Sequence, residues 1–346
     1  MKICTLFDRF ARQGDDPDHQ DTLKQAGAVG NGLKGLGHAA LEAEFDLDLK
    51  GFTRRMKSLN PDLVFNLVES VEGCGRLIYL APAMLDLLGI PYTGNSTDAL
   101  FLTSNKLATK KILQGQGIPS PTAFSPEDLR SPCRVEGEFI IKSVWEHASI
   151  GIGEDSVVSP QNREQLCREL DRRRRVLGGD CFAERYVEGR EFNLSLLGGA
   201  GRPEVLPPAE ILFDAFPPGK KRLVCYRAKW DETSFEYRHT LRSFDFPPGD
   251  APLLERLRGL AEECWRLFRM RGYARVDFRV DQDNSPWVLE VNANPCLSPD
   301  AGFVAAASRA GLDIHEILRR IIRDAGIETD LSSGPLQARA VESPLS

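Results

Sequence analysis

The stretch VLEVNANP, residues 288–295, has the apolar pattern of a buried strand but carries a carboxylate and two amides. The segment ARVDFRVD, residues 274–281, has the same character and carries a further acid in its middle. Between them lies DQDNSP (281–286), which is rich in turn-forming residues. We therefore predict an antiparallel β-hairpin whose turn centres on residues 283 and 284.

This turn sets which residues face each other across the hairpin. Asp277 is predicted opposite Glu290, and Arg275 opposite Asn292. Because side chains alternate between the two faces of a strand, these four share one face. The other face is predicted to be apolar and to consist of Val276, Phe278, Leu289 and Val291.

Two carboxylates directly opposite each other repel, and their burial without partners is costly. A hard divalent cation removes this conflict, because Mg²⁺ prefers carboxylate and amide oxygens and takes further ligands from substrate phosphates. The hairpin therefore indicates a metal site at Asp277, Glu290 and Asn292. The alternative is a solvated sheet face on which Arg275 and Arg279 neutralise the acids.

Two lysines interrupt apolar patterns and could bind those phosphates. Lys142 lies within the predicted strand FIIKSV, and Lys106 opens a helical segment after TSN. A loop that contains two glycines (148–153) follows Lys142, and its backbone N–H groups could cradle a phosphate. The loop matches neither the P-loop pattern nor the dinucleotide-binding glycine pattern. Considered alone, each lysine is more simply explained as a surface side chain.

The composition describes an ordinary globular protein of 346 residues with 42% hydrophobic and 27% charged residues. The net charge of −6 argues against nucleic acid as the main partner. No apolar run is long enough to span a membrane, and no signal peptide is expected. The eight cysteines form no CxxC pair, so we expect reduced thiols in the cytoplasm. The basic run at 172–175 is predicted to be a solvated helix face.

Strands and helices alternate along the first part of the chain, which predicts a parallel α/β unit. We expect strands at 2–7, 61–68 and 90–94 and helices at 21–37 and 76–89. Further on, the expected strands are 138–144, 181–189 and 191–199, and the expected helices are 103–117, 161–177, 251–271 and 313–325. Residues 214–240 are predicted to form a long functional loop, and 330–346 a disordered tail.

In combination, these segments resemble the ATP-grasp ligases, and most closely the D-alanine–D-alanine ligase family. The resemblance lies in NKLATKKIL, FIIKSVWEHASIGI, AERYVEGREFNLSLLG and the hairpin that ends in NANPCLSPDAGF, and it extends over about 60–325. It implies an α/β fold of three domains, with ATP between two sheets. The implied units are an N-terminal domain (1–103), a central ATP-grasp subdomain (104–190) and a C-terminal one with the metal site (191–329).

The resemblance also implies roles for individual residues. ATP and Mg²⁺ are the implied cofactors, with Mn²⁺ as a substitute, and Asp277, Glu290 and Asn292 hold the metal. Lys106 and Lys142 contact phosphates, and Arg275 with the backbone N–H of residue 296 stabilises an oxyanion. Lys229 covers the site from the 214–240 loop. The remaining nucleotide contacts implied are Ser149 and Gly151 in the phosphate loop, Glu184 and the backbone at Tyr186 and Val187 for adenine, and Glu191 for ribose.

The sequence departs from the family where the substrates are bound. The usual Gly-Gly-x-Ser-x-Glu opening is absent from LFDRFARQGDD, and the His-Gly stretch is replaced by VESVEGCG. The family's Glu-Gly-Ser-Ser loop is here Glu146-His147-Ala148-Ser149, an aromatic hydroxyl after Lys229 is replaced by Trp230, and a glycine by Cys296. Substrate contacts are therefore expected at Glu146, Ala148, Trp230, Cys296 and Ser298.

The predicted function is ATP-dependent ligation of a small carboxylate to an amine through an acyl phosphate, in a homodimer. The departures favour substrates other than two D-alanines. Three alternatives stay open: a true D-alanine–D-alanine ligase of cell-wall synthesis, an ester-forming ligase with a hydroxyl acceptor, and a non-catalytic ATP-binding regulator.

Overall fold

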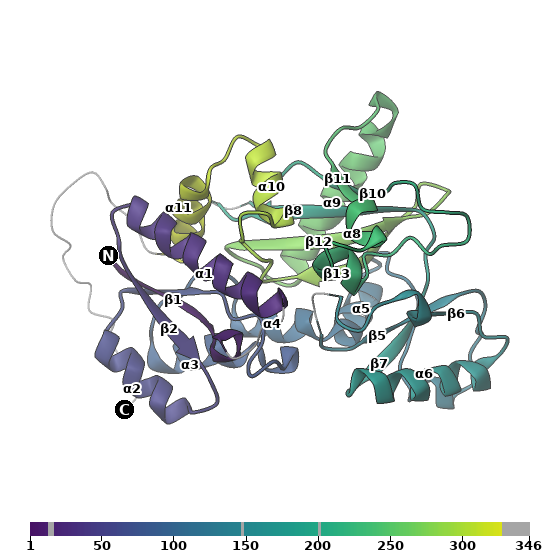
Figure 1. Cartoon of the computed structure of the whole chain (residues 1–346), viewed down its shortest axis with the longest axis horizontal. Helices are drawn as coiled ribbons and strands as arrows, with labels where there is room; N and C mark the ends of the chain where they lie inside the picture. The colour runs from purple at the N-terminus through teal and green to yellow at the C-terminus, as the bar shows by residue number, and fades with distance from the viewer. Residues whose placement is uncertain (13–16, 147–148, 200–201, 327–346) are drawn as a thin grey trace.

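The computed structural model describes residues 1–12, 17–146, 149–199 and 202–326, and the elements in it form three sheets (Figure 1). The first sheet is parallel, in the order β2–β1–β3. Its strands are β1 (Lys2–Asp8), β2 (Ala39–Phe45) and β3 (Leu63–Asn66). The helices of this part of the chain are α1 (Pro17–Gly35), α2 (Leu49–Leu59) and α3 (Leu80–Leu88).

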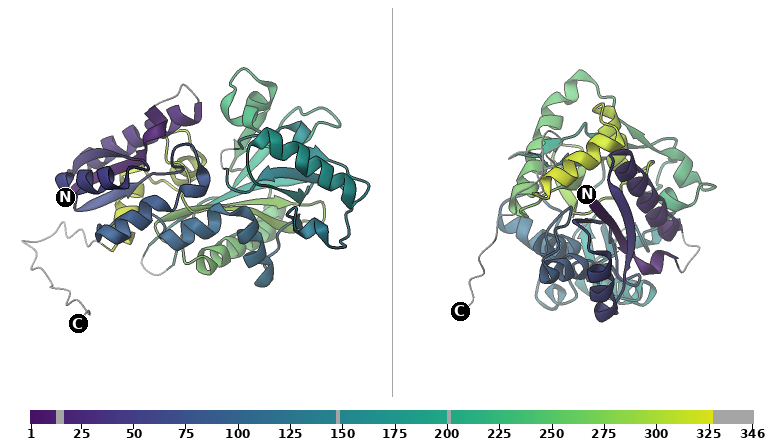
Figure 2. Two further views of the ribbon diagram at one scale, coloured as in Figure 1. Left: turned by 90° about the horizontal axis from the view of Figure 1, so that it is seen from below. Right: turned by 90° about the vertical axis from the view of Figure 1, so that its left-hand side faces the viewer.

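The second sheet is small and antiparallel, in the order β4–β7–β5–β6. It consists of β4 (Ala123–Phe124), β5 (Phe139–Ser143), β6 (Val157–Val158) and β7 (Cys181–Arg185). Helices α4 (Thr97–Ser104) and α5 (Lys106–Gly115) precede it, and α6 (Arg163–Leu177) packs on one of its faces. Figure 2 shows the first sheet and α6 at opposite ends of the molecule.

The third sheet is the largest and runs in the order β11–β10–β8–β12–β13, with β9 paired to β8. Its strands are β8 (Arg190–Leu197), β9 (Glu204–Val205), β10 (Ala209–Phe213), β11 (Thr240–Ser243), β12 (Tyr273–Val280) and β13 (Pro286–Asn292). Helix α9 (Ala251–Leu267) covers its apolar face and contributes to the same buried cluster. Two short helices, α7 (Tyr226–Trp230) and α8 (Phe235–His239), lie before β11.

The end of the described chain packs back on its beginning. Helices α10 (Gly302–Arg309) and α11 (Ile314–Asp324) share one hydrophobic cluster with β1, α1 and β3. Tyr273, at the start of β12, belongs to the same cluster. The first sheet and the third sheet are therefore joined by a common core.

Several predicted elements have different bounds in the structure. The helix expected at 103–117 is two helices, because Asn105 leaves the helical conformation and its side chain caps α5 through the Ala108 N–H at 3.0 Å. The strand expected at 90–94 is a single bridge between Val64 and Tyr92. The 214–240 loop contains α7 and α8, and β2 and α2 were not predicted. The predicted tail at 330–346 lies outside the described residues.

The register of the hairpin is the predicted one at its polar end. Asp277 faces Glu290, and Arg275 faces Asn292. A β-bulge then shifts the pairing by one residue, so that Phe278 faces Val288. The expectation that Leu289 faces the core is therefore wrong, because the bulge inserts Leu289 as an extra residue and Val288 takes the buried position.

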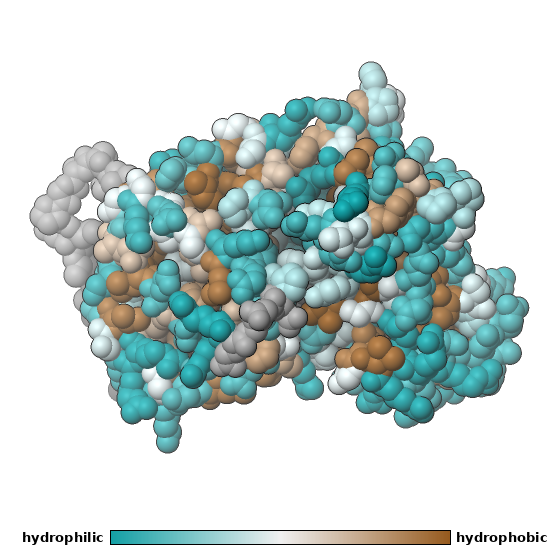
Figure 3. All heavy atoms as spheres, in the orientation of Figure 1, coloured by the Kyte–Doolittle hydropathy of each residue, from teal (hydrophilic) through white to brown (hydrophobic). Residues whose placement is uncertain are grey.

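No helix in the described part of the chain is long and apolar enough to cross a membrane. On the face drawn in Figure 3 most atoms belong to hydrophilic residues, and the hydrophobic ones form scattered patches.

Candidate active site

The site is built on the polar face of the third sheet. Across β8, β12 and β13, Asn193 faces Asp277, which faces Glu290. One step along, Glu191 faces Arg279. The opposite face of the same strands is apolar and buried, with Phe192, Val276, Phe278, Val288 and Val291 at 0–1% exposure. The core on one side thus fixes a row of polar side chains on the other.

Asp277 is held in place by three hydrogen bonds. Arg275 donates from Nε and Nη2 at 2.7 and 2.8 Å, and Asn193 donates at 2.8 Å. Burial opposes the charge on Arg275, but Asp277 and Glu290 together raise its pKa above the usual value. A carboxylate offers about four acceptor positions, so one position on Oδ2 remains for a further ligand. Asn193 was not singled out from the sequence, although it is two residues after Glu191 on the same strand face.

Glu290 and Asn292 complete the candidate metal site. The Lys106 ammonium lies 3.4 Å from the Glu290 carboxylate and donates to the Glu146 carbonyl at 2.6 Å. The side-chain oxygen of Asn292 accepts the Asn294 N–H at 2.9 Å and keeps its second lone pair. The described residues contain no group of three His, Cys, Asp or Glu side chains that could hold a metal by themselves. This donor set fits a cation that completes its coordination with phosphate oxygens and water.

A second charged cluster lies on the neighbouring sheet. Lys142 of β5 and Lys110 of α5 both pair with the Glu184 carboxylate of β7, the former at 2.8 Å. Burial raises the pKa of Glu184, but the two lysines outweigh it and lower the pKa overall. Lys110 is buried and was missed in the sequence, where its spacing of four residues from Lys106 was the available signal.

The residues expected at the adenine and ribose end lie at the end of β7 and the start of β8. The N–H of Tyr186 donates to the Glu138 carbonyl at 2.8 Å, so it is already occupied. Within the described residues, the N–H of Val187 has no hydrogen-bond acceptor. The Glu191 carboxylate lies 3.0 Å from the Arg279 guanidinium. Burial raises the pKa of Glu191, and Arg279 opposes this.

The sequence predicts two loops over the site. We call residues 149–156 the glycine loop and residues 214–240 the covering segment. Ser149 and Gly151 both have left-handed backbones, with φ of 60° and 69°. The Ser149 hydroxyl donates to the Val224 carbonyl in the covering segment at 2.7 Å. Ala148, also expected at this place, lies outside the described residues.

Lys229 reaches the site from α7 in the covering segment. Burial lowers its pKa, the positive charge of Arg275 adds to this, and Glu290, Asp277 and Glu191 oppose it. Electrostatic interaction with these four residues indicates that the ammonium lies near the polar face of the third sheet. Trp230 follows in the same helix and is partly buried.

The predicted substrate residues after the hairpin form a different environment. The Cys296 thiol lies 3.1 Å from the Asp21 carboxylate of α1 and 3.2 Å from the Ser298 hydroxyl. Burial raises the pKa of this thiol, so it is not a thiolate nucleophile. Nearby, Gln25 donates to Glu69 at 2.9 Å.

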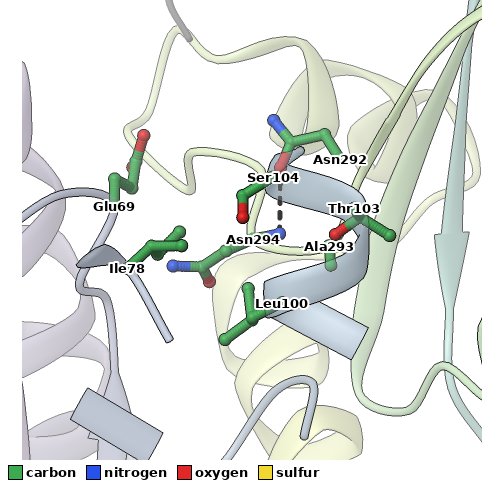
Figure 4. Close-up of a pocket in the computed structure, with 8 residues that line it drawn as sticks. All are labelled: Glu69, Ile78, Leu100, Thr103, Ser104, Asn292, Ala293 and Asn294. Atoms are coloured by element: carbon green, nitrogen blue, oxygen red, sulfur yellow. Dashed lines mark hydrogen bonds between the residues drawn. The ribbon is translucent and has the colours of Figure 1, made fainter. Parts of the chain in front are cut away.

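A small cavity joins this substrate end to the hairpin (Figure 4). Its volume is about 10 Å³, enough for about one water molecule. It is lined by Glu69, Ile78, Leu100, Thr103, Ser104, Asn292, Ala293 and Asn294. The candidate metal ligand Asn292 and the acid Glu69 therefore border the same space. The sequence did not single out Glu69, Asp21 or Gln25.

The comparisons with known proteins identify a family. A family model described as the D-ala D-ala ligase C-terminus matches residues 134–323, more than half of the chain. The uncharacterized protein y4sG of Sinorhizobium fredii is 30% identical over 317 residues, 86% of each chain. A D-alanine–D-alanine ligase of Moorella thermoacetica is 28% identical and covers 93% of this chain and 98% of its own.

Solved structures show the same fold. A D-alanine–D-alanine ligase from Bacillus anthracis, complexed with ATP, aligns with a TM-score of 0.70 at 19% identity, over 94% of this chain and 97% of that one. The fold is therefore the α/β ATP-grasp fold, as predicted. The chain belongs to the D-alanine–D-alanine ligase family and is a ligase of the ATP-grasp type.

Proposed function

We propose that this ligase uses Mg²⁺-ATP to join a small carboxylate to an amine, through an acyl phosphate. The observation that carries the proposal is the polar face of the third sheet. Asp277, Glu290 and Asn292 lie together there, with Lys106 of α5 beside Glu290 and Lys142 on the neighbouring sheet. The ATP in a related solved structure supports the nucleotide, and the donor set described above supports the cation.

The first step transfers the γ-phosphoryl group to an oxygen of the substrate carboxylate and releases ADP. When bound, Mg²⁺ supplies charge neutralisation on the transferring phosphoryl oxygens. Lys106 and Lys142 bring further positive charge to the phosphates, and the glycine loop excludes water above them. The side chain of Glu191 and the N–H of Val187 orient the nucleoside.

In the second step the amine attacks the activated carbonyl and phosphate leaves. Negative charge develops on the carbonyl oxygen, and Arg275 is fixed by Asp277 in a position to stabilise it. Lys229 has its pKa lowered by burial, which makes its proton easier to release. No protein nucleophile takes part, so the eight cysteines need no catalytic role.

The substrates are proposed to differ from two D-alanines. Cys296, Asp21 and Glu69 surround the place where the donor substrate would lie, and Trp230 is an indole beside Lys229. The indole N–H can donate a hydrogen bond but cannot accept one. These side chains favour a substrate that is larger than alanine. That substrate would lie beside the acidic residues Asp21 and Glu69.

The alternatives differ in their product. A true D-alanine–D-alanine ligase gives a dipeptide from D-alanine alone, and the names of several relatives favour it. An ester-forming ligase uses the same acyl phosphate with a hydroxyl acceptor. A non-catalytic ATP-binding regulator would need the paired acids for Mg²⁺-ATP but would not need Arg275 to stabilise an oxyanion.

The decisive experiment combines ADP release with mass spectrometry of products. The purified protein is incubated with Mg²⁺-ATP and a panel of amino acids, hydroxy acids and amines. The proposal predicts an amide product with a pair other than D-alanine and D-alanine. Robust turnover with D-alanine alone contradicts the substrate proposal, and ATP binding without any turnover supports the regulator.

The homodimer and the cytoplasmic location also remain proposals. Sedimentation of the full chain at several concentrations tests the dimer directly. A single monomeric species at every concentration would contradict it.

A further inference from the structure

The basic run at 172–175 contains one arginine that differs from its neighbours. Arg173 is 2% exposed, whereas the other three arginines lie on the exposed side of α6. The prediction of a solvated face is therefore wrong at this position. Burial of a guanidinium is costly unless its donors are paired, so the contacts of its two terminal nitrogens, Nη1 and Nη2, must offset that cost.

Those contacts all lie in the glycine loop. Arg173 donates to the Asp155 carboxylate, to the Gly151 carbonyl and, at 2.8 Å, to the Ser156 hydroxyl. Ser156 itself is fully buried, and its hydroxyl accepts the Gly153 N–H at 3.0 Å. One side chain thus holds both ends of the loop.

The loop and α6 are also in close contact. A Cβ on Gly151 would meet the Leu177 side chain of α6, and the φ of 69° at Gly151 disfavours any other residue. On β5, Ile141 packs in the α6 cluster, whereas Lys142 points to the opposite side. Arg173 therefore acts on the loop from the face of the second sheet that lies away from the candidate phosphate site.

The glycine loop in turn contacts the covering segment. Besides the bond between Ser149 and Val224, the Tyr226 N–H donates to the Ile152 carbonyl at 3.1 Å. Lys220 bridges Glu154 of the loop and Glu236 of α8, the latter at 2.8 Å. Tyr226 is the first residue of α7, which carries Lys229.

We propose that Arg173 is a positioning residue that fixes the conformation of the glycine loop and, through it, the position of the helix that carries Lys229. It does not contact the candidate site itself. The expected effect on kinetics rests on the proposed ATP-dependent function. The contacts between Arg173 and the glycine loop do not depend on that function.

The test compares four single variants of the full-length protein. Arg173→Met removes the donors and keeps the aliphatic volume, Arg173→Lys keeps the charge, and Ser156→Ala removes one partner. Arg175→Met, on the exposed side of the same helix, is the matched control. Thermal melts establish that each variant is folded.

We expect Arg173→Met to raise the KM for ATP about tenfold, because the loop loses its three hydrogen bonds to Arg173 and part of that loss reaches the nucleotide. We also expect a lower kcat, because Lys229 is less well placed. Arg173→Lys should recover part of both losses, and Arg175→Met should change neither. Adding Ser156→Ala to Arg173→Met should cost less than the two single effects together, because both act on one network. Wild-type kinetic constants in folded Arg173→Met would overturn the proposal.

Limited trypsin digestion without nucleotide separates this inference from the proposed function. We expect faster cleavage after Lys220, Lys221 or Arg222 in Arg173→Met than in wild type or Arg175→Met. Equal cleavage rates would refute the proposal that Arg173 fixes the glycine loop, even if the enzyme uses ATP. Faster cleavage would support it even if no ligase activity were found. If Arg173→Met does not fold, the kinetic constants and the cleavage rate are measured on Ser156→Ala instead. The same outcomes then support or refute the proposal.

Discussion

The two ends of the candidate site differ in how their charges are balanced. At the nucleotide end, acids stand beside bases: Asp277 with Arg275, Glu184 with Lys142, and Glu191 with Arg279. At the substrate end, burial raises the pKa of Glu69, Asp18 and Asp21 add to the rise, and Arg275 opposes it. The first region is organised before any ligand binds. The second contains a carboxyl group whose raised pKa keeps it largely protonated at neutral pH.

The largest expected effect is the loss of turnover when a metal-binding acid is neutralised. Glu290→Gln and Asp277→Asn should each lower kcat by at least about 10²–10³-fold. ADP release measures this, and isothermal titration of Mg²⁺-ATP checks that binding weakens as well. Wild-type activity in both variants would refute the metal assignment.

The same two variants should differ in stability. Glu290→Gln leaves Lys106 its Glu146 carbonyl acceptor and should change the free energy of unfolding by less than about 1 kcal/mol. Asp277→Asn leaves Arg275 largely buried without its carboxylate, which should cost roughly 3 kcal/mol. Urea denaturation distinguishes them, and equal losses would contradict this account.

Glu69 should make stability depend on pH. Burial raises its pKa from 4.5 to about 8, with the Gln25 hydrogen bond opposing and Asp18 and Asp21 adding to the rise. The folded protein thus holds this proton more tightly than the unfolded chain. The stability it contributes is full below about pH 4.5 and is lost as the pH rises to about 8.

Glu69→Gln should therefore be more stable than wild type above pH 8, by about 2 kcal/mol once solvent screening is allowed for. The difference should disappear near pH 4.5. Melting temperatures across this range provide the measurement, and a constant difference at all pH values would count against a raised pKa.

A smaller effect is expected at the ribose end. Glu191→Gln should raise the KM for ATP about tenfold, because one charge-assisted hydrogen bond to a hydroxyl is weakened. The KM for the carboxylate substrate should not change. Glu255→Gln on the exposed surface of α9 is the control, and an equal effect in both variants would show that the change is not local.

The smallest expected effect is limited to the substrate end of the candidate site. Cys296→Ala removes the partly buried thiol, a group about the size of one methylene, and should weaken binding of the carboxylate substrate about fourfold, or roughly 0.8 kcal/mol. The KM for ATP should stay at the wild-type value. A change in the KM for ATP alone would show that Cys296 belongs to the nucleotide end.

The sequence predicted most accurately where local pattern and chemistry agree. The alternation of polar and apolar residues placed Asp277 opposite Glu290 without any structure, because turn position and side-chain period determine register. The position of Val288 could not be predicted, because a bulge has no clear signal in a strand of apolar residues.

Other parts of the site depend on contacts between distant segments. Lys110 pairs with Glu184 across 74 positions in the chain, and Cys296 meets Asp21 across 275. Arg173 looked like its exposed neighbours because a run of four arginines hides which one faces inward. Such roles are set by tertiary packing, which no local pattern encodes.

The bulge in β13 determines which residue the hairpin could lose without a change in the register of its metal ligands. Leu289 is the extra residue, and its carbonyl accepts a hydrogen bond from Lys110 at 3.2 Å. Deleting Leu289 would restore regular alternation and leave Glu290 facing the cleft and Val288 facing the core. A one-residue deletion would thus spare the metal ligands, and its cost would fall on the buried lysine that loses an acceptor.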